Sequence, residues 1–294
     1  MMQIDHEKIF KKKRRREQIA FWTFRIISLS IAGVLFWILG FIIYQGIGAI
    51  NWKFLTEFPR NQNQEGGIFP AIVGTMYLVV GSMIFAFPIG ILAGVYMNEY
   101  ARDGILKRII QVMTNNLAGI PSIVFGLFGM SLFVHKLNFG DSMIAGSLTL
   151  GILVLPIVIR TTEEALKAVD NSFRDGSMAL GASKWQTTSR VILPSAFPNI
   201  ITGLILSLGR VSGETAPILF TAVVATTANL PNSILDPVMA LPYHLYTVAT
   251  SGTDIDKCRP IAYGTALVLI AIVLIMNILA NVLRRYFGKK VKTN

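Results

Sequence analysis

The stretch GGIFPAIVGTMYLVVGSMIFAFPIGILAGVYMN, residues Gly66–Asn98, contains no charged side chain. A helix needs about 20 apolar residues to cross the hydrocarbon layer of a bilayer, so this stretch is long enough to span a membrane. A helix is the expected form, because lipid offers no hydrogen-bond partners and a helix satisfies its own backbone groups. Gly90 and Gly94 are spaced four residues apart, which favours close contact with a neighbouring helix.

Five further stretches also lack charged residues: Ile26–Trp52, Ile109–Val134, Ser142–Ile159, Val191–Gly209 and Pro260–Leu283. The chain of 294 residues is 53% hydrophobic and 15% charged, whereas a soluble domain carries roughly 25% charged residues. These observations predict an all-α integral membrane protein with six transmembrane helices. The fifth helix is expected to continue past Arg210 to about Ala222.

The net charge of +11 is distributed unevenly along the chain. If the N-terminus lies in the cytoplasm, six spans place 20 Lys and Arg residues in cytoplasmic segments and 5 in outer loops. This is the positive-inside pattern, in which basic residues set the topology and contact anionic lipid headgroups. The charge therefore indicates membrane lipid as the partner and not nucleic acid, and both termini are expected in the cytoplasm.

The spans predict one membrane domain, residues 18–287, between basic cytoplasmic tails at 1–17 and 288–294. Two of its connections are long enough to carry function. One is a cytoplasmic loop at 160–190, and the other is an outer-face loop at 223–259.

The outer-face loop contains the segment Leu230–Thr253, which is too short and too rich in proline to span the bilayer. An interfacial or partly re-entrant helix is expected here, with Tyr243, His244 and Tyr246 at the depth of the lipid headgroups. The single cysteine, Cys258, lies in the same loop and cannot form a disulfide within the chain.

The cytoplasmic loop contains a short amphipathic pattern. Met178, Ala182 and Trp185 would share one face of a helix. Gly181 costs about 1 kcal/mol inside a helix, so it is expected to end one short helix and let the chain turn into a second. The apolar face of this elbow either lies on the protein's own membrane surface or docks into a groove on another protein.

The stretch DGSMALGASKWQTTSRVILP, which ends at Pro194, resembles the EAA loop of binding-protein-dependent permeases of ATP-binding-cassette (ABC) importers. The positions that correspond to this motif are Asp175, Gly176, Ser177, Gly181, Leu193 and Pro194. The motif of that family begins with Glu-Ala-Ala. This chain keeps an acidic residue at the first position, Asp175, but has Gly176 and Ser177 in place of the two alanines. In that family the loop is the coupling helix that seats in the nucleotide-binding subunit, and the resemblance implies the same role here.

Two further stretches, NLAGIPSIVFGLFG (Asn116–Gly129) and GETAPILFTA (Gly213–Ala222), resemble the PstA permeases of bacterial phosphate importers. The resemblance implies the MetI-like permease fold in the bacterial inner (plasma) membrane and import of inorganic phosphate. It also implies three partners: a PstC-like second permease, an ATPase subunit dimer and an extracytoplasmic phosphate-binding protein.

No phosphate-binding loop of the form G-x-x-x-x-G-K-[ST] occurs in the sequence. The chain is therefore expected not to be an enzyme. ATP and Mg²⁺ would bind to the partner ATPase, and no cofactor is expected on this chain.

Arg210 and Glu214 are opposite charges within the fifth apolar stretch. A charge at the bilayer centre costs about 3 kcal/mol or more, so such residues face a protein interior or a water-filled path. At i and i+4 on a helix the two side chains would share one face. They are either a self-neutralising pair that holds helices in register or part of the anion path.

On the second interpretation, the guanidinium of Arg210 offers a planar fork of donors that matches phosphate oxygens. Glu214 would compete with the ion and keep its binding weak enough for release. Ser207, Ser212 and Thr215 are candidate auxiliary donors. In the phosphate permeases that the chain resembles, the matching Arg and Glu are associated with the transport path.

Other functions remain open at this point. The chain could be a permease for another oxyanion, such as sulfate or molybdate, or a stand-alone secondary transporter or channel. A membrane-embedded enzyme is disfavoured, because the histidines His6, His135 and His244 are scattered and show neither a catalytic arrangement nor metal-ligand spacing.

Overall fold

The computed structural model describes residues 6–61, 63–227, 229–251 and 255–293. The helices and helical turns are α1 (His6–Gly46), η1 (Ile47–Ala49), α2 (Trp52–Thr56), α3 (Phe69–Val95), η2 (Tyr96–Tyr100), α4 (Ile105–Leu117), α5 (Ser122–Gly129), η3 (Met130–Lys136), α6 (Met143–Lys167), α7 (Asn171–Ala179), α8 (Lys184–Thr187), η4 (Thr188–Ile192), α9 (Leu193–Gly213), α10 (Ala216–Leu219), α11 (Leu241–Ser251) and α12 (Ile255–Thr293). The strands β1 (Pro59–Arg60) and β2 (Glu65–Gly66) form a small antiparallel hairpin. The predicted helical fold class is confirmed, with this hairpin as a minor addition.

Five helical stretches among the described residues are long and apolar enough to cross a membrane: Lys13–Ala49, Phe69–Tyr100, Met143–Lys167, Lys184–Gly213 and Asp256–Tyr286. The third predicted span differs from a straight helix. It consists of Lys107–Leu117 and Ser122–Lys136, which are bent by 103° relative to each other. Pro121 explains the break, because proline lacks an N–H donor and disfavours helical geometry at the residue before it.

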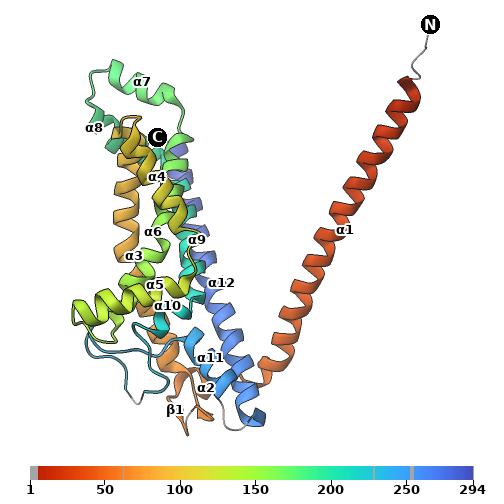
Figure 1. Cartoon of the computed structure of the whole chain (residues 1–294), viewed down its shortest axis with the longest axis vertical. Coiled ribbons are helices and arrows are strands. Elements are labelled where there is room, and N and C mark those ends of the chain that lie inside the picture. The colour runs from red at the N-terminus through yellow and green to blue at the C-terminus, as the bar shows by residue number, and fades with distance from the viewer. Residues whose placement is uncertain (1–5, 62, 228, 252–254, 294) are drawn as a thin grey trace.

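The centre of the molecule is formed by α3, α6 and α9 (Figure 1). The glycines of α3 allow close packing against α6, as predicted. A Cβ atom at Gly90 would lie 2.6 Å from Val158, and one at Gly94 would lie 2.7 Å from Thr162. There is no room for a side chain at either position, so the small residues set the distance between the two helices.

The ends of two helices differ from the sequence expectation. Helix α6 continues to Lys167, well into the predicted cytoplasmic loop. Helix α9 ends at Gly213, so the expectation of a continuous helix to Ala222 was wrong. Pro217 gives the reason, because in a continuing helix it would leave the Gly213 carbonyl without a donor and clash with it.

Helix α11 packs along α12. Its residues Leu241, His244 and Val248 are buried on one face, and His244 is 2% exposed. His244 is therefore enclosed by protein instead of facing lipid headgroups, whereas Tyr246 is exposed. His244 Nδ1 lies 3.3 Å from the hydroxyl of Thr265. The histidine is outside the candidate spans, and burial lowers its pKa to about 4.

Figure 1 shows α7 and α8 at one end of the bundle and α2, β1 and α11 at the other. Helix α1 leans away from the bundle and meets it near its C-terminal end, where Gly46 lies against the backbone of Tyr263. The described residues of both predicted tails continue the adjoining helices, because α1 begins at His6 and α12 extends to Thr293. The start of α1 and the end of α12 lie at the same end of the molecule as α7.

Candidate functional site

Arg210 and Glu214 form an ion pair at the point where α9 ends. Arg210 lies in the last turn of the helix, and its Nε is 3.4 Å from Oε1 of Glu214. Glu214 follows the helix and has an extended backbone, with ψ of 127°. The predicted contact is present, but it depends on the turn out of the helix and not on a continuous helix face.

The guanidinium of Arg210 is not sealed inside the protein. Its side chain is 32% exposed, whereas that of Glu214 is 16% exposed. Among the described residues, only Nε has a hydrogen-bond partner, so the terminal nitrogens are available. A guanidinium presents five N–H donors in total, and those on the terminal nitrogens can hold the oxygens of a tetrahedral anion.

The three predicted auxiliary donors have different surroundings. Ser207 is fully buried, and its Oγ has no partner among the described residues. Ser212 donates to the Leu208 carbonyl at 2.7 Å, so its proton is already used. Thr215 is half-buried and precedes α10. The structure therefore pairs Arg210 with Glu214 and leaves Ser207 as the unsatisfied hydroxyl.

Asn277 on α12 is a polar neighbour that the sequence analysis missed. A Cβ atom at Gly209 would lie 3.9 Å from its Nδ2, which places the amide beside the residue that precedes Arg210. Its Oδ1 is buried without a described partner. The signal in the sequence was an amide within an otherwise apolar span, since intramembrane polar residues turn inward.

The two PstA-like stretches contact each other next to this pair. A Cβ atom at Gly126 of α5 would lie 2.9 Å from the Ala216 carbonyl oxygen and 3.0 Å from Pro217 Cα of α10. The broken third span thus packs against the segment that follows Glu214. This contact positions the turn out of α9, and with it the Glu214 side chain.

The elbow that was predicted to couple to an ATPase, defined as α7 and α8 with the turn between them, projects from the end of the bundle (Figure 1). Gly181 lies between the two helices with φ of +84°, which confirms the predicted turn. Ser183 caps α8 through a reciprocal bond with Gln186. Asp175 and Gly176 are exposed, and Ser177 contacts the Thr187 hydroxyl at 2.9 Å.

Leu193 and Pro194 form the first turn of α9, directly after η4. They therefore connect the elbow to the helix that carries Arg210. The elbow exposes large apolar side chains to its surroundings: Phe173, Met178, Leu180 and Trp185. Leu180 is 91% exposed, and an exposed apolar patch of this kind marks a site of contact with another protein or with a membrane.

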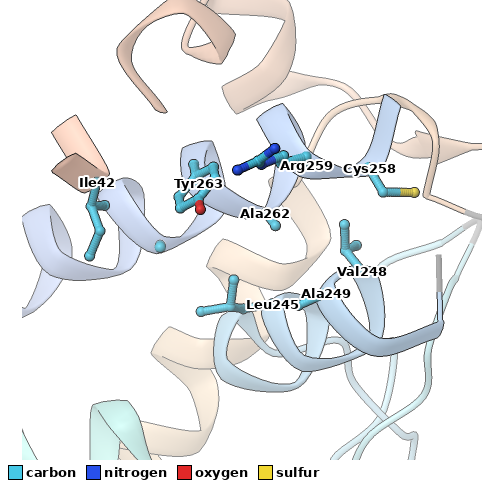
Figure 2. A pocket seen from close by; sticks show the side chains of 9 residues that line it. Ile42, Leu245, Val248, Ala249, Cys258, Arg259, Ala262 and Tyr263 are labelled. Carbon is cyan, nitrogen blue, oxygen red and sulfur yellow. The ribbon is translucent and has the colours of Figure 1, made fainter. Parts of the chain in front are cut away.

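A cavity of about 370 Å³ lies elsewhere, between the end of α1 and helices α11 and α12 (Figure 2). Its walls are mainly apolar, and Arg259 is its one cationic side chain. A smaller hollow of about 200 Å³ between α4 and α6 is lined by four charged residues of α6, which form the ion pairs Arg160–Glu164 and Lys167–Glu163. Neither lining includes Arg210, and the balanced charges of the smaller hollow offer little attraction to an anion.

The chain resembles known transport permeases over most of its length. The family described as "Binding-protein-dependent transport system inner membrane component" matches residues 86–293. The chain is 34% identical over 289 residues to the probable ABC transporter permease protein YqgI of Bacillus subtilis, covering 95% of this chain and 98% of the relative. It is 36% identical to the phosphate transport system permease protein PstA of Haemophilus influenzae, covering 82% and 84% of the two chains.

Solved structures show the same fold at low sequence identity. A chain of a bacterial alginate ABC transporter in complex with a periplasmic protein superimposes with a TM-score of 0.69 at 16% identity, covering 95% of this chain and 98% of the other. A chain of the MetNI methionine ABC transporter gives a TM-score of 0.59 at 16% identity, covering 75% and 97%. Together with the family match, these similarities establish that the chain belongs to the family of inner membrane components of binding-protein-dependent transport systems.

Proposed function

We propose that this chain is the transmembrane permease subunit of an ATP-driven ABC importer for inorganic phosphate. The observation that supports this most directly is the Arg210 guanidinium, one third exposed at the broken end of α9, with its terminal nitrogens unpaired among the described residues. The choice of phosphate as the anion is supported by relatives that are named as phosphate transport permeases.

The chemistry of the pair suits a transient anion site. A permanently charged, planar donor group holds phosphate oxygens better than a lysine would. The carboxylate of Glu214 neutralises Arg210 when the site is empty and competes with the ion when it arrives. A transport site needs this balance, because an ion that is bound too tightly is not released.

The exposed elbow is consistent with transport that is driven by a separate ATPase subunit. Its exposed apolar residues match helix-in-groove recognition, in which a partner covers a short amphipathic helix. The partner would be an ATPase dimer that binds ATP and Mg²⁺, so that this chain needs no cofactor of its own. A PstC-like permease would complete the pore, and an extracytoplasmic binding protein would deliver phosphate.

The topology follows from the charges. The coupling elbow, the basic start of α1 and the basic end of α12 lie at one end of the molecule (Figure 1). The positive-inside rule places this end in the cytoplasm, so the site would be reached from the opposite face of a bacterial inner membrane.

The direct test is uptake of labelled phosphate by proteoliposomes that contain the co-expressed complex, with and without internal ATP. We expect phosphate uptake to require ATP and to be unaffected by an excess of sulfate or molybdate. Uptake without ATP would indicate a secondary transporter or channel. If sulfate or molybdate inhibited the uptake of labelled phosphate at the same concentration as unlabelled phosphate does, the substrate would be another oxyanion.

A further inference from the structure

The coupling elbow is joined to the membrane bundle by a largely buried ion pair. Arg174 of α7 places Nη2 2.7 Å from Oε1 of Glu99 and Nε 3.4 Å from Oε2. Glu99 lies in η2, the π-helical turn that follows α3. The side chains are 17% and 8% exposed, so water screens this pair far less than it screens a surface pair.

The same guanidinium also holds the end of α6. Nη2 donates to the Leu166 carbonyl at 2.9 Å, and Nη1 donates to the Val169 carbonyl at 2.9 Å. A cation at a helix C-terminus satisfies carbonyls that have no intrahelical donor and interacts favourably with the helix dipole. One arginine therefore joins three elements, the elbow helix α7, the end of α6 and the turn after α3.

Glu99 is also held by a neighbouring residue of its own helical turn, η2. Asn98 Nδ2 donates to Glu99 Oε1 at 2.7 Å, which restricts the carboxylate. A second contact from the elbow reaches the same turn, because Lys184 Nζ of α8 lies 5.2 Å from the centroid of the Tyr100 ring. Both helices of the elbow thus contact η2.

We propose that the Glu99–Arg174 pair transmits displacement of the elbow to α3 and α6, so that both residues are positioning residues for transport. This inference rests on the proposed function, in which an ATPase moves the elbow. The pair resists separation, because pulling it apart would leave a largely buried charge without its partner. Since Gly90 and Gly94 pack α3 directly on α6, a force at Glu99 moves the two helices as one body.

The test uses the reconstituted complex with Arg174→Gln and Glu99→Gln, and Arg174→Lys as a milder variant. The ATPase should still co-purify and hydrolyse ATP, while phosphate taken up per ATP falls at least about fivefold, the scale of a typical coupling free energy. Lys107→Gln is the matched control. It breaks an ion pair of 2.9 Å with Asp103, whose side chain is 97% exposed, and should leave the ratio of uptake to hydrolysis unchanged.

A second readout does not depend on the transported ion. Spin labels at Tyr77 on α3 and Leu274 on α12, both exposed positions, report the distance between these helices in a Cys258→Ser background. An ATP analogue that is not hydrolysed should change this distance in the parent complex and in Lys107→Gln, but not in Arg174→Gln.

The outcomes separate the two proposals. An unaltered distance change in Arg174→Gln would overturn the role of the ion pair, whichever anion is carried. The parent complex could instead take up no phosphate and still show a distance change that is lost in Arg174→Gln. That outcome would support the role of the ion pair and reject phosphate as the substrate. Failure of any ATPase to bind the parent complex would overturn both.

Discussion

Nε of Arg210 lies 3.4 Å from Oε1 of Glu214, although the helix that carries the arginine ends one residue before the glutamate. The backbone leaves helical geometry at Glu214 and brings the carboxylate back to the last turn of α9. The contact therefore depends on the packing of α5 against α10, which fixes the direction of the chain after Gly213. Movement of either element would change how Arg210 is neutralised.

Arg210→Ala should reduce ATP-dependent phosphate uptake to background, because no other group replaces the donor fork. Arg210→Lys should retain a small part of the uptake, since it keeps the charge and loses the bidentate geometry. Labelled phosphate uptake measures both variants, and co-purification of the ATPase shows that the complex is assembled. Arg60→Ala, which removes an exposed arginine, is the control. Normal uptake by Arg210→Ala would rule out the anion site.

Glu214→Gln should tighten phosphate binding and slow its release, because the competing carboxylate is gone. The effect on KM is expected to be up to about fivefold, since a partly exposed ion pair contributes about 1 kcal/mol or less. Initial rates of uptake over a range of phosphate concentrations should show both KM and kcat falling. If the pair served only to hold helices in register, the melting temperature would fall while KM stayed constant.

Gly181→Val should weaken the elbow, because valine at φ of +84° is strained whatever the space around it. The cost of a left-handed conformation is roughly 1–2 kcal/mol for an L-residue and higher for a β-branched one. Binding of the ATPase and the ratio of uptake to hydrolysis should both fall. Gly181→Asn is the matched control and should be tolerated, because asparagine adopts the left-handed region more readily than valine. Equal coupling in the valine and asparagine variants would contradict this account.

Gly90→Val should destabilise the bundle, because its Cβ would lie 2.6 Å from Val158 and force α3 away from α6. Overpacking of this kind costs typically about 1–3 kcal/mol. Thermal unfolding in detergent should show a lower melting temperature. Gly33→Val on α1 has nothing within 4 Å and should leave the midpoint unchanged. Equal midpoints for the two variants would show that the close approach is not needed.

His244 should make the protein less stable in acid. Burial lowers its pKa from the ordinary 6.5 to about 4, so between these values the unfolded chain binds more protons than the folded one. Stability is therefore full above pH 6.5 and falls as the pH drops toward 4, by at most about 3 kcal/mol. Melting temperatures of the parent and of His244→Gln across this range measure the effect.

The slope between pH 6.5 and 4 should be smaller in His244→Gln than in the parent. An unchanged slope in His244→Gln would mean that other groups cause the acid sensitivity.

The sequence alone determined the features that depend on local composition. Apolar length predicted the spans, Gly90 and Gly94 predicted a close helix contact, and Gly181 predicted the turn of the elbow. These predictions succeed because bilayer thickness and the conformational freedom of glycine act on residues that are close together in the chain.

The tertiary structure decided the features that depend on distant partners. Burial of His244 against α12, the amide of Asn277 beside Gly209 and the contact of Glu99 with Arg174, 75 residues apart, have no local pattern. Pro121 and Pro217 marked where helices could break, but packing of α5 on α10 decided where the chain then runs. The physical reason is that a side chain's burial and partners depend on which surfaces meet, and helical periodicity specifies only which residues share a face.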